Sequence, residues 1–319
     1  HFDVAVFTNL TPEHIEAHGG FENYKKAKGK LFEVLARTKK KTINGSVIKK
    51  TAVVNTDNEH GHYFLQFSAD TTYGFSVQGT CVLPPSANHA CVSASAVVVS
   101  PEGVSFDVEN TKFRTHLLGQ FNVENALCAA VTAKSLGVDL SVAASALAKI
   151  EEIPGRMKFI REGQKFTAII DFAHTPSSFE GVFAVMRQLK DPHGRIIVVF
   201  GSAGGGRDKW KRPELGKIAA RAADHIILTA DDPYEEDVDV ICAEIQKGID
   251  GEIFKGKVEV ISNRRETITT ALHMARWNDI VLFLGKGTEQ TLMIGTESVS
   301  WNEESIVIEE IRNMLYDRK

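Results

Sequence analysis

Two apolar strands, each followed directly by a polar or glycine-rich turn and then a helix, constrain this chain more than any other feature. The first strand is predicted at Phe166 to Ile170 and runs into Asp171-Phe172-Ala173-His174. The second, Ile196 to Phe200, runs into a loop that begins at Gly201. Strands that alternate with helices form parallel sheets, and ligands bind beyond the carboxyl ends of such strands. We therefore expect a ligand site at one edge of a parallel sheet.

The same alternation continues to the end of the chain. Further strands are predicted at residues 225–229, 258–261 and 280–284, and helices at 178–189, 213–222, 238–249, 264–276 and 303–315. This pattern predicts a doubly wound α/β domain. Pro154-Gly155 is the strongest boundary signal in the chain, so we place the domains at residues 1–153 and 154–319.

The first half has a different pattern. It opens with a predicted strand at residues 4–7 and a helix at 21–37, and Thr11 is predicted to cap a helix with Pro12 at its first position. Short strands are then predicted at 51–55, 63–67, 73–77, 96–100 and 104–108. These strands predict an antiparallel appendage packed on the first sheet, followed by helices near Gly119 and Ser141.

Composition excludes several classes of protein. With 319 residues, 43% of them hydrophobic and 24% charged, the chain has the composition of a soluble globular protein. A net charge of −4 gives no electrostatic case for a nucleic-acid partner. No apolar run approaches membrane-spanning length, so we expect no membrane partner. The four cysteines lack CxxC spacing, which favours a reducing cytoplasm over a disulfide framework.

Lys28 stands out in the helix at 21–37. The spacing of Tyr24, Lys28, Leu31 and Leu35 predicts that all four lie on the inward face. The lysine stem could lie along the apolar face while its ammonium reaches water. Alternatively, burial would lower the pKa of the amine and leave it neutral. A neutral amine can take up carbon dioxide and become a carbamate, an anion able to bind Mg²⁺.

Two asparagines fall in the first turn of the helix near Gly119. Asn122 is well placed to cap that helix. Asn125 lies inside the turn, where asparagine is a poor helix former, so a ligand contact is an alternative explanation for it.

Three more polar clusters follow predicted strands of the second half: 207–209, 231–237 and 285–289. Residues 201–206 have the glycine spacing of a phosphate loop, but Arg207-Asp208 stand where Lys and Ser or Thr are required. The loop's amides and Arg207 could still hold a carboxylate or phosphate, and a flexible surface turn explains the glycines equally well. The convergence of several clusters on one sheet edge indicates a site without identifying its ligand.

Together these segments resemble the Mur ligase family. Asp171 to Pro176 is similar to its D-Y-A-H-T-P element, Phe200 to Pro213 to its glycine-rich F-G-[CS]-G-G-D-R-D-x-x-K-R-P element, and Gly285 to Glu289 to G-K-G-H-E with Thr288 in place of His. In the first half the resemblance is carried by Thr8 to His14, His18 to Lys28, Gly119 to Ala130 and Pro154 to Met157. The match spans nearly the whole chain and follows the branch of UDP-MurNAc-tripeptide synthetases.

The resemblance implies an ATP-dependent acid–amino-acid ligase of peptidoglycan synthesis. Such a ligase is cytoplasmic and monomeric, and it joins an amino acid to UDP-MurNAc-L-Ala-D-Glu. ATP phosphorylates the terminal carboxylate and the incoming amine attacks the acyl phosphate, which requires Mg²⁺ and close alignment of the reactants. The fold implied is the remainder of a central ATPase domain followed by a Rossmann-like domain that binds the amino acid.

The resemblance also implies roles for individual residues. Lys28, as a carbamate, and His14 would be catalytic and would bind Mg²⁺. The residues implied around the nucleotide are Asn125, Arg156, Asp171 and His174. Those implied around the incoming amino acid are Arg207, Asp231, Asp232, Gly285 and Glu289.

The chain departs from the family pattern in four features. The UDP-binding domain, the P-loop and the acidic Mg²⁺ ligand that precede the segment matched here are not in the sequence, and His1 to Phe7 begins almost inside a strand. We therefore expect a truncated chain that is inactive alone. Asp231-Asp232-Pro233-Tyr234 replaces the D-N-P-R of diaminopimelate-adding enzymes. Loss of the arginine predicts a basic substrate, L-lysine or ornithine, held near Asp232 or Glu289.

Two other functions stay open. A folylpolyglutamate or cyanophycin synthetase would use the same scaffold, although Asp171 to Pro176 favours the muramyl branch. A Mur-like binding or scaffold subunit without a P-loop is the non-enzymatic alternative.

Overall fold

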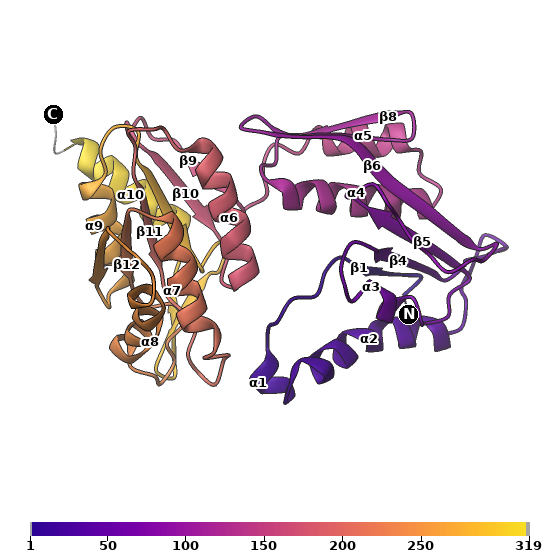
Figure 1. Cartoon of the computed structure of the whole chain (residues 1–319), viewed down its shortest axis with the longest axis horizontal. Helices are drawn as coiled ribbons and strands as arrows, with labels where there is room; N and C mark the ends of the chain where they lie inside the picture. Colours follow the sequence, from indigo (N-terminus) through magenta and orange to yellow (C-terminus); the bar gives the residue numbers. More distant parts are fainter. Residues whose placement is uncertain (1, 317–319) are drawn as a thin grey trace. The chain divides into compact units, whose positions relative to one another are not determined.

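The computed structural model describes residues 2–316, and the chain divides into two compact units between Glu151 and Glu152 (Figure 1). The sequence places the domain boundary between residues 153 and 154. Each unit is built around its own six-stranded sheet. None of the helices within residues 2–316 is long and apolar enough to cross a membrane.

The sheet of the first unit is mixed. Its strands follow the order β1 (Val4–Phe7), β4 (Thr51–Asn55), β5 (Thr71–Ser76), β6 (His89–Ser100), β7 (Gly103–Val108) and β8 (Thr111–Thr115). The pairs from β1 to β6 are parallel, and the pairs β6–β7 and β7–β8 are antiparallel. A separate hairpin, β2 (Thr42–Ile43) with β3 (Ser46–Val47), lies between the first long helix and β4.

The predicted antiparallel part is confirmed only beyond β6, and it continues the sheet instead of packing on it. The first half of β6 pairs with β5 in parallel, and the second half pairs with β7 after a bulge between Ser95 and Val98. Strand β6 therefore belongs to both the parallel and the antiparallel part of the sheet. The short strands predicted from the sequence did not reveal this continuity. The strand predicted at 63–67 is wrong: Gly61–Phe64 form the short helix α3.

Helices cover both faces of this sheet (Figure 1). Successive residues of β4 point to opposite faces of the sheet. Val53 packs into the core with α4 (Gln120–Ser135) and α5 (Leu140–Leu147). Its neighbours Ala52 and Val54 pack into the core with α2 (Phe21–Arg37) and α3.

The sheet of the second unit confirms the doubly wound prediction. Its strands follow the order β13 (Lys257–Val260), β12 (His225–Leu228), β11 (Ile196–Phe200), β14 (Ile280–Leu284), β10 (Thr167–Asp171) and β9 (Lys158–Ile160). All neighbours are parallel except β9, which is antiparallel to β10. The strands β8, β9 and the hairpin β15 (Thr291–Ile294) with β16 (Glu297–Ser300) are absent from the sequence-based prediction.

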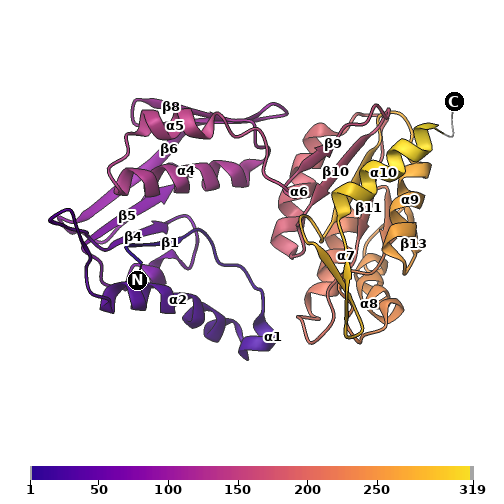
Figure 2. The ribbon, with the colours of Figure 1, turned by 180° about the vertical axis from the view of Figure 1, so that it is seen from behind.

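Five helices cover the two faces of this second sheet. In Figure 1, α6 (Pro176–Leu189), α7 (Lys211–Ala222) and α8 (Val238–Asp250) lie in front of it. Figure 2 shows α9 (Arg264–Met274) and α10 (Glu303–Tyr316) on the other face. Ile197 and Val199 of β11 pack into the core beneath α9 and α10, whereas Phe200 meets Phe179 of α6.

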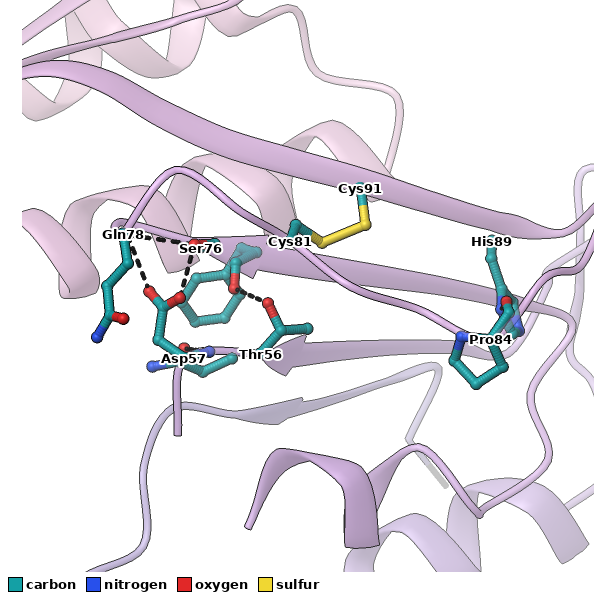
Figure 3. Close-up of a disulfide and its surroundings, with 10 residues drawn as sticks. Thr56, Asp57, Ser76, Gln78, Cys81, Pro84, His89 and Cys91 are labelled. Atoms are coloured by element: carbon teal, nitrogen blue, oxygen red, sulfur yellow. Dashed lines mark hydrogen bonds between the residues drawn. A yellow bond between two sulfur atoms is a disulfide. The ribbon is translucent and has the colours of Figure 1, made fainter. Parts of the chain in front are cut away.

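Cys81 and Cys91 form a disulfide between the loop after β5 and strand β6 (Figure 3). The expectation that the cysteines form no disulfide is wrong for this pair, because sheet pairing brings together two cysteines that lack a local motif. Cys91 pairs in register with Gly74, and a Cβ at Gly74 would lie 2.7 Å from the Cys81 sulfur. Asp57 anchors the start of the loop by accepting hydrogen bonds from the Ser76 hydroxyl and the Val77 amide, both at 2.6 Å.

Candidate active site

Four neighbouring parallel strands of the second unit end at one edge of its sheet. The residues at or just beyond these ends are Asp171 of β10, Gly285 after β14, Gly201 after β11 and Asp231 after β12. Because neighbouring parallel strands end together, the topology places the strand-end clusters side by side, as the sequence predicts. We take this edge as the candidate site of the second unit.

A lysine lies at the centre of its acidic part. The Nζ of Lys286 is 2.9 Å from Oδ1 of Asp232 and 2.7 Å from Oε2 of Glu289. One oxygen each of Asp231, Asp232 and Glu289 lies within 4.8 Å of the others. Gly285 makes this approach possible, since a Cβ at that position would lie 2.2 Å from Oδ2 of Asp231. Three of the residues implied for the amino-acid site therefore meet around Lys286, to which the sequence assigns no role.

Burial and the neighbouring charges act in opposite directions on the pKa values of this cluster. It raises the pKa of the Asp231 carboxyl, against the charges of Arg264 and Lys286. Burial would lower the pKa of the Lys286 ammonium, but the charges of Asp231, Asp232 and Glu289 outweigh it and raise that pKa. The Lys286 ammonium contacts two of these carboxylates directly, those of Asp232 and Glu289. The arrangement is an ion-pair network of three carboxylates and one ammonium.

The glycine-rich loop packs closely against the loop that carries Asp231 and Asp232. The Gly204 amide donates to the Asp232 carbonyl at 2.9 Å, and a Cβ at Gly204 would lie 2.1 Å from the Pro233 carbonyl oxygen. Close backbone approach therefore explains this glycine better than surface flexibility does. Arg207 is exposed at the tip of the loop, where its side chain is accessible to a ligand.

Arg212 supports this loop from below and is absent from the sequence-based site. It is fully buried, donates to the Ala203 carbonyl at 3.1 Å, and pairs with Glu236 and Glu244 at 3.0 and 2.7 Å. Its position in the first turn of α7 does not reveal its burial, although Arg212 falls in the K-R-P part of the matched family element.

Three residues implied for the nucleotide gather around Phe172. The Arg156 guanidinium carbon lies 4.5 Å from the centre of the Phe172 ring, and the His174 ring lies 4.8 Å from it at 72°. Asp171 is buried, and its two carboxylate oxygens accept from the Met157 and Ala173 amides, each at 2.7 Å. Burial raises the pKa of Asp171 despite these bonds. Its visible role is to hold the 154–157 segment against the loop.

In the first unit, His14 and Lys28 lie beside the same aromatic ring. The His14 ring centre is 6.1 Å from that of Tyr24, and the Lys28 Nζ is 5.0 Å from it. His14 has φ 53° and directly precedes α1 (Ile15–His18), so the predicted helix start at Thr11 is wrong. The two residues implied to bind Mg²⁺ thus both lie near Tyr24, and their role stays a prediction.

The prediction that Lys28 lies on the buried face of α2 is wrong. The buried residues of that helix are Tyr24, Gly29, Phe32 and Leu35, while Lys28 and Leu31 are exposed. Gly29 decides the orientation, because Tyr63 packs directly on it: a Cβ there would lie 2.6 Å from the tyrosine hydroxyl oxygen.

Of the two asparagines singled out in α4, Asn122 differs from expectation. Gly119 is the residue before the helix, and Asn122 donates from its side chain to the Leu118 carbonyl at 2.7 Å, so its capping role is wrong. Asn125 is exposed and donates to Oδ1 of Asn122 at 3.2 Å. The ligand contact suggested for Asn125 stays a prediction.

Comparison with protein families decides the assignment. Residues 1–133 match the model of the Mur ligase middle domain, and residues 155–287 match the model of the Mur ligase, glutamate ligase domain. The chain belongs to the Mur ligase family. The predicted family and its fold are thereby confirmed.

Individual relatives agree with this assignment. The chain is 40% identical over 316 residues to the UDP-N-acetylmuramyl-tripeptide synthetase of Roseiflexus sp. (strain RS-1), covering 95% of this chain and 58% of that protein. It is 36% identical over 311 residues to the UDP-N-acetylmuramoyl-L-alanyl-D-glutamate--2,6-diaminopimelate ligase of Geobacillus kaustophilus (strain HTA426), covering 96% of this chain and 59% of that protein. The chain thus spans less than two thirds of these curated Mur ligases.

A solved structure of a UDP-N-acetylmuramoyl-L-alanyl-D-glutamate--2,6-diaminopimelate ligase is similar with a TM-score of 0.55 and 28% identity. The match covers 98% of this chain and 61% of that one.

Proposed function

We propose that this Mur ligase chain provides the nucleotide-binding and amino-acid-binding domains of an ATP-dependent ligase of peptidoglycan synthesis. The ligase adds a basic amino acid, L-lysine or ornithine, to UDP-MurNAc-L-Ala-D-Glu. The observation that carries the specificity is the acidic cluster around Lys286 at the carboxyl edge of the second sheet.

The charges of this cluster favour a cationic substrate. Three carboxylates face one ammonium, which leaves two negative charges if Asp231 is ionised and one if it is protonated. Arg264 does not neutralise the remainder, because it is paired with Glu303 at 2.7 Å. A substrate ammonium would share Asp232 and Glu289 with Lys286 and gain favourable interaction in a partly buried site.

The neighbouring loops fit the rest of an amino acid. Exposed Arg207 is suited to a carboxylate, because a guanidinium can donate two parallel hydrogen bonds. Tyr234 stands where diaminopimelate-adding enzymes have arginine, so it offers no positive charge to a distal carboxylate. A substrate with an ammonium at its far end satisfies both features.

Nucleotide and metal would be held by the other groups. Arg156 and His174, on either side of Phe172, and Asn125 of the first unit are proposed to contact ATP. His14 and Lys28 beside Tyr24 would hold Mg²⁺, Lys28 only as a carbamate. When bound, Mg²⁺ offsets the charge of the phosphoryl group.

The proposed cellular setting follows from the substrate. Nucleotide-linked muramyl peptides are made in the cytoplasm, where a monomer without nucleic-acid or membrane partners would act. Light scattering that found a stable oligomer would contradict the proposed monomer.

The specificity is tested by incorporation of amino acids into UDP-MurNAc-L-Ala-D-Glu by the natural full-length protein. We expect turnover with L-lysine or ornithine and little with diaminopimelate, and Asp232→Asn to weaken use of the basic substrates. Preference for diaminopimelate would overturn the specificity while leaving the ligase assignment intact. Transfer of glutamate to folate would favour the folylpolyglutamate alternative, and ATP binding without any transfer would favour a scaffold role.

A further inference from the structure

A buried arginine outside the candidate site holds two of its loops. Arg264, in the first turn of α9, is 1% exposed, and so is its partner Glu303 at the start of α10. The Arg264 Nε and Nη2 atoms donate to the Glu303 carboxylate at 3.0 and 2.7 Å. The indole nitrogen of Trp301 donates to the same carboxylate at 2.7 Å. The pair is thus enclosed and shared among three segments.

The remaining donors of Arg264 reach the ends of two strands. Nη1 donates to the Ala230 carbonyl at 3.0 Å, and Nη2 donates to the Leu284 carbonyl at 2.8 Å. Ala230 directly precedes Asp231, and Leu284 directly precedes Gly285. A guanidinium is planar and rigid, so its donors set the separation of the carbonyls that they bind. One side chain therefore defines how far apart the β12 and β14 loops lie.

Stability alone is a weak explanation for such a pair. Burying two charges costs several kcal/mol per ion, and well-packed apolar residues often replace buried ion pairs without loss of stability. What apolar side chains cannot reproduce is the simultaneous attachment of two backbone carbonyls at fixed positions. We infer that Arg264, with Glu303 and Trp301, is a positioning unit that sets the geometry of the Asp231 and Gly285–Glu289 loops for the incoming amino acid. The functional part of this inference rests on the proposed function.

Arg264→Lys separates charge from geometry. Lysine keeps the positive charge beside Glu303, but its compact ammonium cannot replace the fork that spans Ala230 and Leu284. Arg195→Lys is the matched control. Arg195 donates to Asp279 at 2.6 Å and to the Met274 carbonyl at 3.0 Å, at the amino-terminal edge of the same sheet. It is therefore also a paired arginine that joins two segments, but it does not touch the candidate site.

The first readout is amide hydrogen exchange in the folded chain. Loss of a hydrogen bond to a charged group corresponds to about tenfold or more in a local opening equilibrium. We expect Arg264→Lys to speed exchange about tenfold in residues 230–237 and 285–290 and to leave 191–195 unchanged. Arg195→Lys should do the reverse. Equal acceleration across the whole unit in both variants would mean a purely structural role and would overturn the inference.

Trp301→Phe gives a milder variant if Arg264→Lys fails to fold. It keeps an aromatic ring but removes one donor to Glu303, so a smaller acceleration in the same two segments is expected. Unchanged exchange there would contradict the positioning unit.

The second readout is kinetic and uses the natural full-length ligase. Arg264→Lys should raise KM for the amino acid about tenfold and leave KM for ATP unchanged, whereas Arg195→Lys should change neither. Equal KM values in Arg264→Lys and the natural enzyme would overturn the inference. If the natural enzyme used no amino acid, the proposed function would fail, while localised exchange would still identify the positioning unit.

Discussion

Lys286 and Asp232 are 54 residues apart in sequence, yet their Nζ and Oδ1 atoms lie 2.9 Å apart at the carboxyl edge of the second sheet. The Lys286 side chain is completely buried, and Asp232 also accepts from the Met293 amide at 2.8 Å. This contact ties the β14 loop, the β12 loop and the β15–β16 hairpin together. It is central both to the stability of the edge and to its proposed specificity.

Replacing the buried lysine should destabilise the chain strongly. Lys286→Gln leaves two carboxylates without their counter-ion, and breaking a buried pair costs about 3 kcal/mol. Lys257→Gln is the control, because Lys257 pairs with Glu259 at 2.7 Å but is 69% exposed and should cost less than about 1 kcal/mol. Urea unfolding measures both free energies. Equal, small losses would show that the Lys286 network contributes little.

Gly285 should tolerate no side chain. It has φ 106°, and the Cβ of alanine would lie 2.2 Å from Asp231 Oδ2. Gly285→Ala therefore combines backbone strain with displacement of a buried carboxylate, about 3 kcal/mol or more in the free energy of unfolding. Gly295→Ala has only the strain of φ 60°, with open space around it, and should cost about 1 kcal/mol. Similar thermal shifts for both variants would refute the close approach at Gly285.

Two buried aspartates of the second sheet should give opposite pH dependence. Burial raises the pKa of Asp171 above its ordinary 3.8, so its native state binds more protons than the unfolded state in this range. The stability from Asp171 is thus fully present below pH 3.8 and is lost as pH rises through the raised pKa. Asp279 is also buried, but its hydrogen bonds, chiefly from Arg195, outweigh burial and lower its pKa. Its stability is present above the ordinary value and is lost as pH falls.

Unfolding free energies measured against pH for Asp171→Asn and Asp279→Asn test these signs. Relative to the natural chain, Asp171→Asn should be least favourable at low pH and should improve as pH rises. The Asp279→Asn difference should change in the opposite direction. Parallel curves would contradict the assigned shifts.

The disulfide should stabilise the first unit. It closes a loop across 10 residues, for which the entropy of the unfolded chain suggests about 2 to 3 kcal/mol. Dithiothreitol should therefore lower the melting temperature of the natural chain. The double variant Cys81→Ser, Cys91→Ser should already melt at that lower temperature and should not respond to the reductant. An identical response of both proteins would exclude the bond.

Local residue patterns predicted many of the helices and strands correctly. In these segments local preference and tertiary packing favour the same structure. The helix at Phe21–Arg37 and the strands at Ile196–Phe200 and Ile280–Leu284 were predicted with the observed bounds. The continuous apolar runs of the two strands are typical of a sheet covered on both faces. Strand β6 pairs with β5 through its first half and with β7 through its second half. The local spacing of apolar residues could not show that one strand has these two partners.

The candidate site, too, was predicted only in part. Glycine and acidic clusters after strands located the edge, because strand ends are visible in sequence. The inward orientation of Lys28 was wrong because Gly29, the smaller residue, faces Tyr63. Arg264 and Lys286 were not singled out, because a buried cation is recognised by distant partners such as Glu303 and Asp232, which the chain brings close only on folding.

We propose that the natural full-length ligase couples amino-acid transfer to ATP. The most direct measurement is ADP release by the natural full-length protein, with UDP-MurNAc-L-Ala-D-Glu and L-lysine added separately and together. We expect rapid ADP release, with one lysine incorporated per ADP, only when both substrates are present. ADP release that is independent of lysine, or absent with both substrates, would contradict it.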